Sequence, residues 1–168
     1  DMSTAQSDFL KVIPVGGLIL DLGCGSGRDS KAFLQAGYRV DSMDGSKALC
    51  AAASKILQQP VMHKRFDELD DERKYDGVWA CAYLLHVSSD DISDILQKIF
   101  LALKPNGVFY MSVKKGTCEG YRDGRYFTDY TEERIQKVLA EYPFQIIRLW
   151  ESNDVRPGRE EIWLNVLA

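Results

Sequence analysis

The stretch from Asp21 to Asp29 holds the densest group of potential ligand-binding atoms in the chain. It reads Asp-Leu-Gly-Cys-Gly-Ser-Gly-Arg-Asp and follows an apolar run over residues 18–22. Glycines adopt backbone angles that other residues avoid, and they let a ligand approach the backbone closely. A ligand at this position lies beyond the carboxyl end of a strand and at the start of a helix, where open α/β sheets bind their ligands.

The spacing of the glycines argues against two common nucleotide-binding motifs. The dinucleotide fingerprint G-x-G-x-x-G needs its third glycine at position 28 or 30, where Arg28 and Ser30 stand. A P-loop needs Gly-Lys-Ser or Gly-Lys-Thr after four spacers, and no such triplet follows. The pattern is G-x-G-x-G from Gly23, with an acid two residues ahead of it.

A second acid, Asp44, ends the next apolar run and lies 21 residues after Gly23. A carboxylate there can accept hydrogen bonds from both hydroxyls of a ribose, because each of its oxygens is an acceptor. NAD-binding folds place an acid at a similar spacing, so Asp44 alone does not select the cofactor. The alternative role is capping the helix expected over residues 46–58. With the glycine loop nearby, ribose binding is the favoured interpretation.

The segment from Asp21 to Gly27 resembles motif I of the class I S-adenosylmethionine (SAM)-dependent methyltransferases, in which the loop wraps the methionine portion of SAM. The resemblance covers residues 13–113 firmly and the rest more loosely. It implies that Asp44 binds the ribose, that Asp67 accepts the adenine amine beside Phe66, and that the backbone of residues 80–82 borders the methionine end. The implied cofactor-binding residues are Asp21, Gly23, Cys24, Gly25, Ser26, Gly27, Arg28, Asp44, Gly45, Phe66, Asp67, Ala80 and Cys81.

His86 is the candidate catalytic residue. SAM brings an electrophilic methyl group, so the protein mainly supplies orientation and electrostatics, and a general base is needed only for a protonated acceptor. His86 lies just beyond the apolar run over residues 75–80, and an unperturbed imidazole pKa of about 6.5 suits proton removal. The alternative is a histidine that only lines the pocket. Arg28 has two candidate partners, the SAM carboxylate or a nearby acid, and Cys24 is interpreted as a small loop residue.

These residues need a scaffold, and the order of apolar runs and helical patterns predicts a doubly wound α/β domain spanning residues 1–168. The predicted sheet is mostly parallel, and its last two strands form an antiparallel hairpin because no helix separates them. A polar loop over residues 114–130 carries arginines, which suit a carboxylate or oxyanion. We expect strands over residues 18–22, 38–43, 61–64, 75–80, 108–113, 144–150 and 162–167, and helices over 4–12, 28–36, 46–58, 90–103 and 131–141.

Composition narrows the classes of partner. The formal net charge of the 168-residue chain is −4, which argues against nucleic acid. Four widely spaced cysteines fit neither a metal site nor a disulfide framework, so we expect no metal and a reducing, cytoplasmic setting. No apolar run approaches the roughly 20 residues that span a bilayer, so no membrane partner is expected.

The expected acceptor is a small molecule. The cues Leu85-His86-Val87 and Gly124-Arg125-Tyr126-Phe127-Thr128 resemble small bacterial methyltransferases of the tellurite-resistance-like group, which implies a metalloid or thiol acceptor. Two alternatives stay open: methylation of a macromolecule, and a non-catalytic SAM-binding regulatory module. Against the first, residues 80–83 read Ala-Cys-Ala-Tyr where nucleic-acid methyltransferases carry Asn/Asp-Pro-Pro-Tyr.

Overall fold

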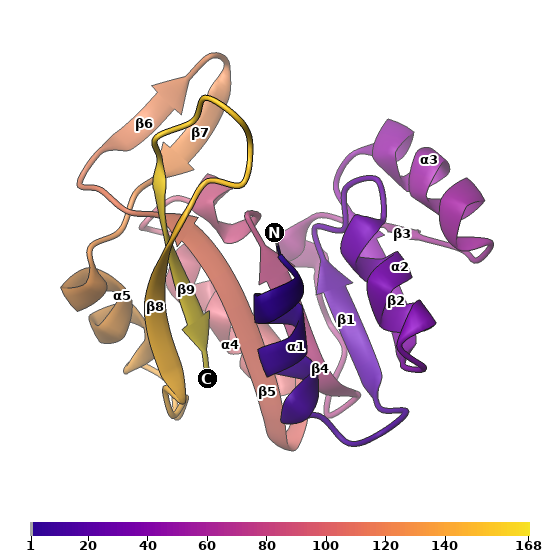
Figure 1. Cartoon of the computed structure of the whole chain (residues 1–168). Coiled ribbons are helices and arrows are strands. Elements are labelled where there is room, and N and C mark those ends of the chain that lie inside the picture. The colour runs from indigo at the N-terminus through magenta and orange to yellow at the C-terminus, as the bar shows by residue number, and fades with distance from the viewer. Residues whose placement is uncertain (1) are drawn as a thin grey trace.

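The computed structural model describes residues 2–168, in which seven strands form one central sheet (Figure 1). The strand order is β3-β2-β1-β4-β5-β9-β8. The sheet strands are β1 (Leu18–Leu22), β2 (Arg39–Asp44), β3 (Met62–His63), β4 (Tyr75–Cys81), β5 (Leu103–Lys114), β8 (Arg148–Asn153) and β9 (Ile162–Leu167). The helices are α1 (Ser3–Lys11), α2 (Arg28–Gln35), α3 (Lys47–Leu57), α4 (Ile92–Ala102) and α5 (Glu132–Leu139).

The predicted doubly wound topology is confirmed. Strands β1 to β5 pair in parallel, whereas β9 pairs antiparallel with both β5 and β8. The strand order reverses between β1 and β4, because β1 leads outward to β2 and β3 while β4 leads to β5. Open α/β sheets bind ligands in the crevice at such a reversal, at the carboxyl ends of the strands.

Helices cover both faces of the sheet, because successive residues of a strand point to opposite sides. Trp79 and Tyr110 face α1 and α2, with their rings stacked at a centroid distance of 3.9 Å, and Phe33 of α2 meets Trp79 edge-on at 5.2 Å. The neighbouring residues of β4 and β5, Val78 and Phe109, face the core that also holds the apolar residues of α4 and α5. Each fully buried side chain of this size contributes roughly 1.5–3 kcal/mol.

The region expected as a loop over residues 114–130 contains a hairpin of β6 (Glu119–Arg122) and β7 (Arg125–Thr128). Its two turn residues, Asp123 and Gly124, both have positive φ angles, of 50° and 76°. This is the geometry of a type I′ turn, for which an Asp-Gly dipeptide between strands is a strong signal. The sequence therefore contained the information for this hairpin, and the expectation of an irregular loop was wrong.

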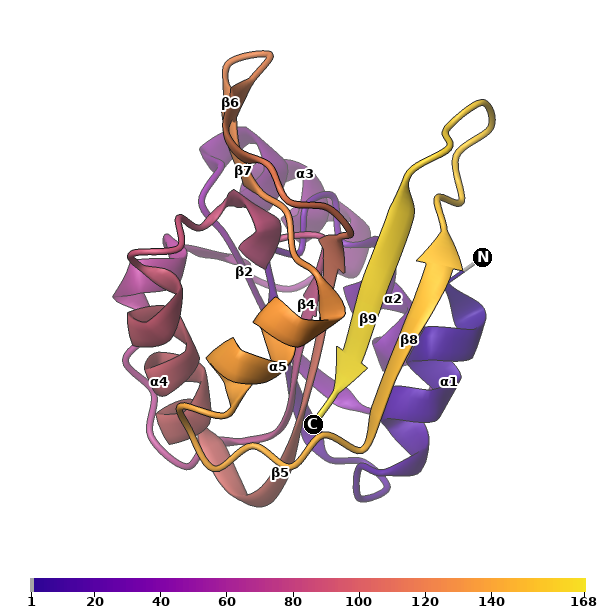
Figure 2. The same cartoon turned by 90° about the vertical axis from the view of Figure 1, so that its left-hand side faces the viewer.

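Strand boundaries also differ from expectation, and β5 begins at Leu103 rather than at position 108. Strand β8 begins at Arg148 rather than at position 144, because Phe144 packs instead against Phe100 and Phe109, with centroid distances of 5.7 and 5.5 Å. Between β3 and β4 there is only a 3-10 turn over Phe66–Glu68, in keeping with the short stretch there. The β6–β7 hairpin and the β8–β9 connection both rise beyond the carboxyl ends of the parallel strands (Figure 2).

Candidate functional site

The glycine loop joins the end of β1 to the start of α2. The N–H groups of Gly23 and Cys24 both donate to the carbonyl of Met43, at 2.9 and 3.0 Å, so the loop is attached to the end of β2. Gly23, Gly25 and Gly27 have φ angles of 78°, 56° and 92°, a region that strongly favours glycine. The space where a Cβ of Gly25 would stand is open, so a ligand can approach the loop there.

Asp44 lies at the carboxyl end of β2 and is only 6% exposed. One of its carboxylate oxygens accepts the N–H of Gly25 at 3.0 Å, and the other accepts the N–H of Ser46 at 2.8 Å. The N-cap of α3 is Ser46, whose hydroxyl accepts the N–H of Leu49. Ser46, and not Asp44, is therefore the N-cap of α3. The carboxylate of Asp44 instead joins the glycine loop to the start of α3.

Asp21 lies behind the loop rather than on its surface. The residue is 2% exposed, and its carboxyl group accepts the hydroxyl of Ser30 at 2.6 Å, which in turn lies 2.7 Å from the hydroxyl of Ser42. Burial raises the pKa of Asp21 to about 7, and the hydrogen bond from Ser30 opposes that rise. Asp21 thus connects β1, α2 and β2 beneath the loop.

Arg28 pairs with a nearby acid. Its guanidinium donates to both oxygens of Asp29, at 2.9 and 3.1 Å. Asp29 also accepts the indole N–H of Trp79 at 2.9 Å and the amide of Gln6 at 2.8 Å. The Arg28 side chain is 62% exposed and lines the cavity described below, so this pair lies between the glycine loop and that cavity.

Tyr83, which the sequence analysis did not single out, covers the glycine loop. A Cβ placed on Gly23 would stand 2.1 Å from the Tyr83 ring, and one placed on Gly45 would stand 3.7 Å from the Tyr83 hydroxyl. Ala82 precedes it with a φ of 53° and donates its N–H to the hydroxyl of Ser112 at 2.9 Å. Burial raises the Tyr83 pKa to about 12. The ring therefore lies directly over the first glycine of the loop.

The expected adenine-side residues occupy the turn after β3. The ring of Phe66 meets Tyr83 edge-on at a centroid distance of 5.9 Å. Asp67 pairs with the guanidinium of Arg65 at 2.5 and 3.0 Å, in an exposed position. Phe66 and Tyr83 thus form a continuous aromatic surface next to Gly23 and Gly45. The carboxylate of Asp67 is already paired with Arg65.

The remaining predicted cofactor-binding residues differ in exposure. Ser26 is exposed at the tip of the loop, whereas Ala80 is fully buried in the core. Cys24 and Cys81 are free thiols, and burial raises the pKa of both, that of Cys81 to about 12. A thiol must lose its proton to act as a nucleophile, so these two cysteines are poor nucleophiles at neutral pH.

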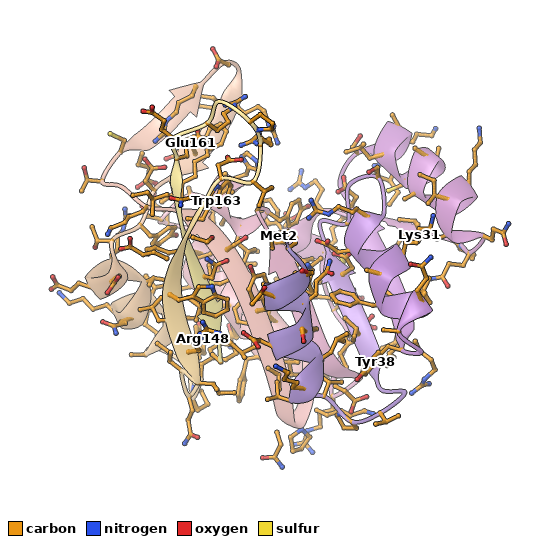
Figure 3. All side chains as sticks on the ribbon, in the orientation of Figure 1. Met2, Lys31, Tyr38, Arg148, Glu161 and Trp163 are labelled. Carbon is orange, nitrogen blue, oxygen red and sulfur yellow. The ribbon has the colours of Figure 1, made fainter. Side chains whose placement is uncertain are left out.

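A separate cavity of about 860 Å³ opens beside the methionine end expected for the cofactor, against Cys81 and Ala82. Its walls come from the start of α1, the ends of β4 and β5, strand β7 and the β8–β9 hairpin. Figure 3 shows Glu161 and Trp163 toward the upper part of that hairpin, with Met2 nearby at the start of α1. Among residues 2–168, the basic residues that line the cavity are Arg28, Lys114, Arg122, Arg125, Arg148, Arg156 and Arg159. The acidic residues that line it are Asp123, Asp154 and Glu161.

His86 lines this cavity, at the end of a 3-10 turn over Leu84–His86. Its Nδ1 lies 2.8 Å from the carbonyl oxygen of Tyr126, and its Nε2 lies 2.8 Å from Nη2 of Arg125. A carbonyl only accepts and a guanidinium only donates, so Nδ1 carries the proton and the lone pair of Nε2 accepts from Arg125. Burial lowers the His86 pKa, and Arg125 and Lys114 lower it further.

Residues 2–168 form neither a metal-ligand cluster nor a membrane-spanning helix. No group of three or more histidine, cysteine and acidic side chains is arranged to hold a metal ion there. No helix in that part of the chain has both the length and the apolar character needed to cross a bilayer.

Comparisons with known proteins agree with this arrangement. Residues 20–109 match the family model described as a methyltransferase domain. The ubiquinone biosynthesis O-methyltransferase of Rickettsia bellii is 22% identical over 147 residues, covering 82% of this chain but 60% of that protein. The chain therefore spans less than two thirds of the length of this curated relative.

Solved structures share the fold. The 1,6-didemethyltoxoflavin-N1-methyltransferase of Burkholderia thailandensis, with 1,6-didemethyltoxoflavin and S-adenosylhomocysteine bound, has a TM-score of 0.82 at 23% identity over 99% of this chain and 77% of that one. TehB of Haemophilus influenzae has a TM-score of 0.80 at 16% identity over 98% of this chain and 61% of that one. The family match spans more than half of the chain and includes the glycine loop, Asp44 and β4, so the chain belongs to the methyltransferase domain family.

Proposed function

We propose that the protein transfers a methyl group from SAM to a small-molecule acceptor. One observation carries the proposal: a left-handed glycine loop and a buried carboxylate, Asp44, meet at the switch point of the sheet, directly beside a separate cavity. A methyltransferase needs a cofactor site and an acceptor site that open onto each other. The arrangement supplies both on one edge of the sheet.

The residues of the loop fit SAM. Gly25 leaves open space for a ligand against the backbone, and the two oxygens of Asp44 suit a pair of ribose hydroxyls. The carboxylate of Asp44 accepts hydrogen bonds from the N–H groups of Gly25 and Ser46, which lie at the edge of the same site. Asp21 holds the loop from behind through Ser30, and Phe66 supplies an apolar face for adenine. The Tyr83 ring shares this space and has to leave Gly23 for the cofactor to lie along the loop.

When bound, SAM supplies the electrophilic methyl group, and the chain supplies binding and orientation. Asp44 holds the ribose, the glycine loop holds the methionine portion, and the backbone of residues 80–82 faces the methyl end. Alignment of reacting groups is worth at best roughly 7–11 kcal/mol. His86 is the proposed proton acceptor for an acceptor that carries a hydroxyl or an amine.

A small molecule is the favoured acceptor because residues of two hairpins, β6–β7 and β8–β9, line the cavity. The bound 1,6-didemethyltoxoflavin in the Burkholderia thailandensis structure supports this acceptor class by analogy. A narrower version of the proposal is a metalloid or thiol acceptor, together with membership of the tellurite-resistance-like group. The likeness of the fold to that of TehB supports this version at the level of the fold alone. A cytoplasmic setting also belongs to the proposal, in keeping with the four free cysteines.

The first test is calorimetric titration with S-adenosylhomocysteine and, separately, with NAD. The proposal predicts saturable binding of S-adenosylhomocysteine at one site per chain and no binding of NAD. Binding of NAD, or of neither ligand, would contradict it. Binding of S-adenosylhomocysteine without methyl transfer to any compound in a small-molecule panel, measured with methyl-labelled SAM, would favour the non-catalytic module.

A further inference from the structure

The cavity beside the glycine loop holds more positive charge than its own carboxylates neutralise. Six of its seven basic residues have a carboxylate partner within residues 2–168. These pairs are Arg28–Asp29, Lys114–Glu161, Arg122–Asp129, Arg148–Asp8, Arg156–Asp154 and Arg159–Glu161. The seventh, Arg125, has no carboxylate within 4.0 Å in the described chain, and its guanidinium donates instead to Nε2 of His86 at 2.8 Å.

Arg125 lies where an anion would find further support. Its guanidinium carbon is 5.9 Å from the centre of the Phe127 ring, and the same ring has Arg122 at 5.3 Å and Lys114 at 4.9 Å. Three cations thus surround one aromatic side chain on the cavity wall. A neutral imidazole gives a guanidinium one acceptor atom, whereas a carboxylate gives two in matching geometry and a full opposite charge.

Building on the proposed function, we propose that the acceptor carries a carboxylate group, which pairs with the Arg125 guanidinium and thereby releases the Nε2 lone pair of His86. The released Nε2 then accepts the proton of the acceptor's hydroxyl or amine. In that step the O–H or N–H bond of the acceptor breaks, an N–H bond forms on Nε2, and the electron pair left behind becomes the nucleophile. His86 afterwards returns this proton to solvent.

The surroundings of His86 set the direction of its titration. The cationic groups that face it are Arg125 from β7 and Lys114 from β5, and the carbonyl of Tyr126 holds its Nδ1 proton. Both cations disfavour the charged imidazolium. A carboxylate on Arg125 cancels one of these positive charges and removes the donor from Nε2, so the pKa of His86 rises toward its ordinary value. The acceptor would therefore activate its own base as it binds.

Nuclear magnetic resonance of the imidazole nitrogens tests this directly, because the chain has only two histidines. His63 is the internal reference: it is exposed, and its Nε2 lies 3.1 Å from the carbonyl of Gly45, away from the cavity. The full chain, saturated with S-adenosylhomocysteine, is titrated from pH 5 to 8 alone, with benzoate, and with benzamide, which has the same shape but no charge. Benzoate should raise the His86 pKa by about one unit, whereas benzamide should not, and His63 should respond to neither.

Two variants separate Arg125 from the general charge of the cavity. Arg125→Gln should raise the His86 pKa without any probe, abolish the response to benzoate and weaken benzoate binding about tenfold. Arg159→Gln is the matched control, since this arginine lines the same cavity and lies 3.9 Å from its nearest carboxylate partner, Glu161. It should keep the response of the unmodified protein.

The outcomes distinguish this inference from the proposed function. Equal effects of benzoate and benzamide, or equal losses in the two variants, would overturn the specific pairing with Arg125. Binding of S-adenosylhomocysteine with no effect of benzoate on His86 would reject the carboxylate acceptor while leaving methyl transfer standing. Absence of S-adenosylhomocysteine binding under the same conditions would instead reject the proposed function itself.

Discussion

The two halves of the sheet hold their functional residues by different means. In the half built from β1 to β4, backbone groups fix the site: the glycine loop is attached to the Met43 carbonyl, and Asp44 is held by two N–H groups. In the half built from β5 to β9, side-chain ion pairs line the cavity, and most of them are partly exposed. The first half thus relies on backbone donors and the second on charged side chains.

The halves also differ in charge. The first buries the carboxyl groups of Asp21, Asp29 and Asp44 next to or beneath the loop. The second surrounds its cavity with basic residues, although the chain as a whole has a net charge of −4. A cationic sulfonium suits the acidic side, and an anionic acceptor suits the basic side. Under the proposed function, this charge difference favours SAM at the glycine loop and the acceptor in the adjacent cavity.

Asp44→Asn should have the largest effect and should affect the first half alone. The carboxamide has one acceptor oxygen and no charge, so it cannot hold both ribose hydroxyls as a carboxylate does. Hydrogen bonds to charged groups contribute about 1.5–3 kcal/mol each, and the affinity for S-adenosylhomocysteine should fall on the order of 100-fold by calorimetry.

Arg159→Gln, in the second half, is the control for this substitution and should bind S-adenosylhomocysteine like the unmodified chain. Because Asp44 also accepts from Gly25 and Ser46, the thermal unfolding of Asp44→Asn has to be measured alongside. An unchanged affinity in a well-folded Asp44→Asn variant would show that the carboxylate serves the loop and does not bind the ligand.

Tyr83→Ala should have a smaller effect in the opposite direction. The ring covers Gly23, and a ligand that binds only the uncovered state loses affinity in proportion to the covered population. Removing the ring should tighten S-adenosylhomocysteine binding about tenfold, which corresponds to about 1.4 kcal/mol. Tyr83→Phe keeps the ring and should bind S-adenosylhomocysteine like the unmodified chain. If Tyr83→Ala bound S-adenosylhomocysteine more weakly, the ring would instead be part of the binding surface.

The same contrast explains which parts of the site could be predicted from the sequence. The glycine loop and Asp44 are local patterns attached to strands, and the family match includes them. The place of Tyr83 depends on a positive φ at Ala82, whose N–H is held by Ser112, 30 positions further along the chain. No local pattern records such a contact.

The cavity was harder to predict for the same reason. Two of its ion pairs join residues that are far apart in sequence: Glu161 comes 47 positions after Lys114, and Arg148 comes 140 positions after Asp8. The arginines of residues 114–130 indicated an anion, but their sequence positions could not show that Arg125 alone would lack a carboxylate. The β6–β7 hairpin is the exception, since the Asp123-Gly124 turn is a local signal that was available.

Glu119→Gln should have the smallest effect and should be confined to the second half. One oxygen of Glu119 accepts from the N–H and hydroxyl of Ser89 and from the Tyr126 hydroxyl, all at 2.8–2.9 Å, and the other accepts from Arg134 at 3.2 Å. These bonds lower its pKa from 4.5 to about 2. Because the folded-state pKa is lowered, the carboxylate stabilises the hairpin above pH 4.5, and that contribution is lost as the pH falls through about 2.

At neutral pH the glutamine variant removes the charge without acid. Amide hydrogen exchange in β6 and β7 should become several-fold faster, while exchange in β1 and β4 stays unchanged, because the hairpin is connected to the domain through such polar contacts and the strands through backbone ladders and a buried core. Faster exchange throughout the sheet would mean that the two halves unfold together. The hairpin carries Arg125, so a local effect would also mean that the acceptor side can adapt its shape while the cofactor side stays fixed.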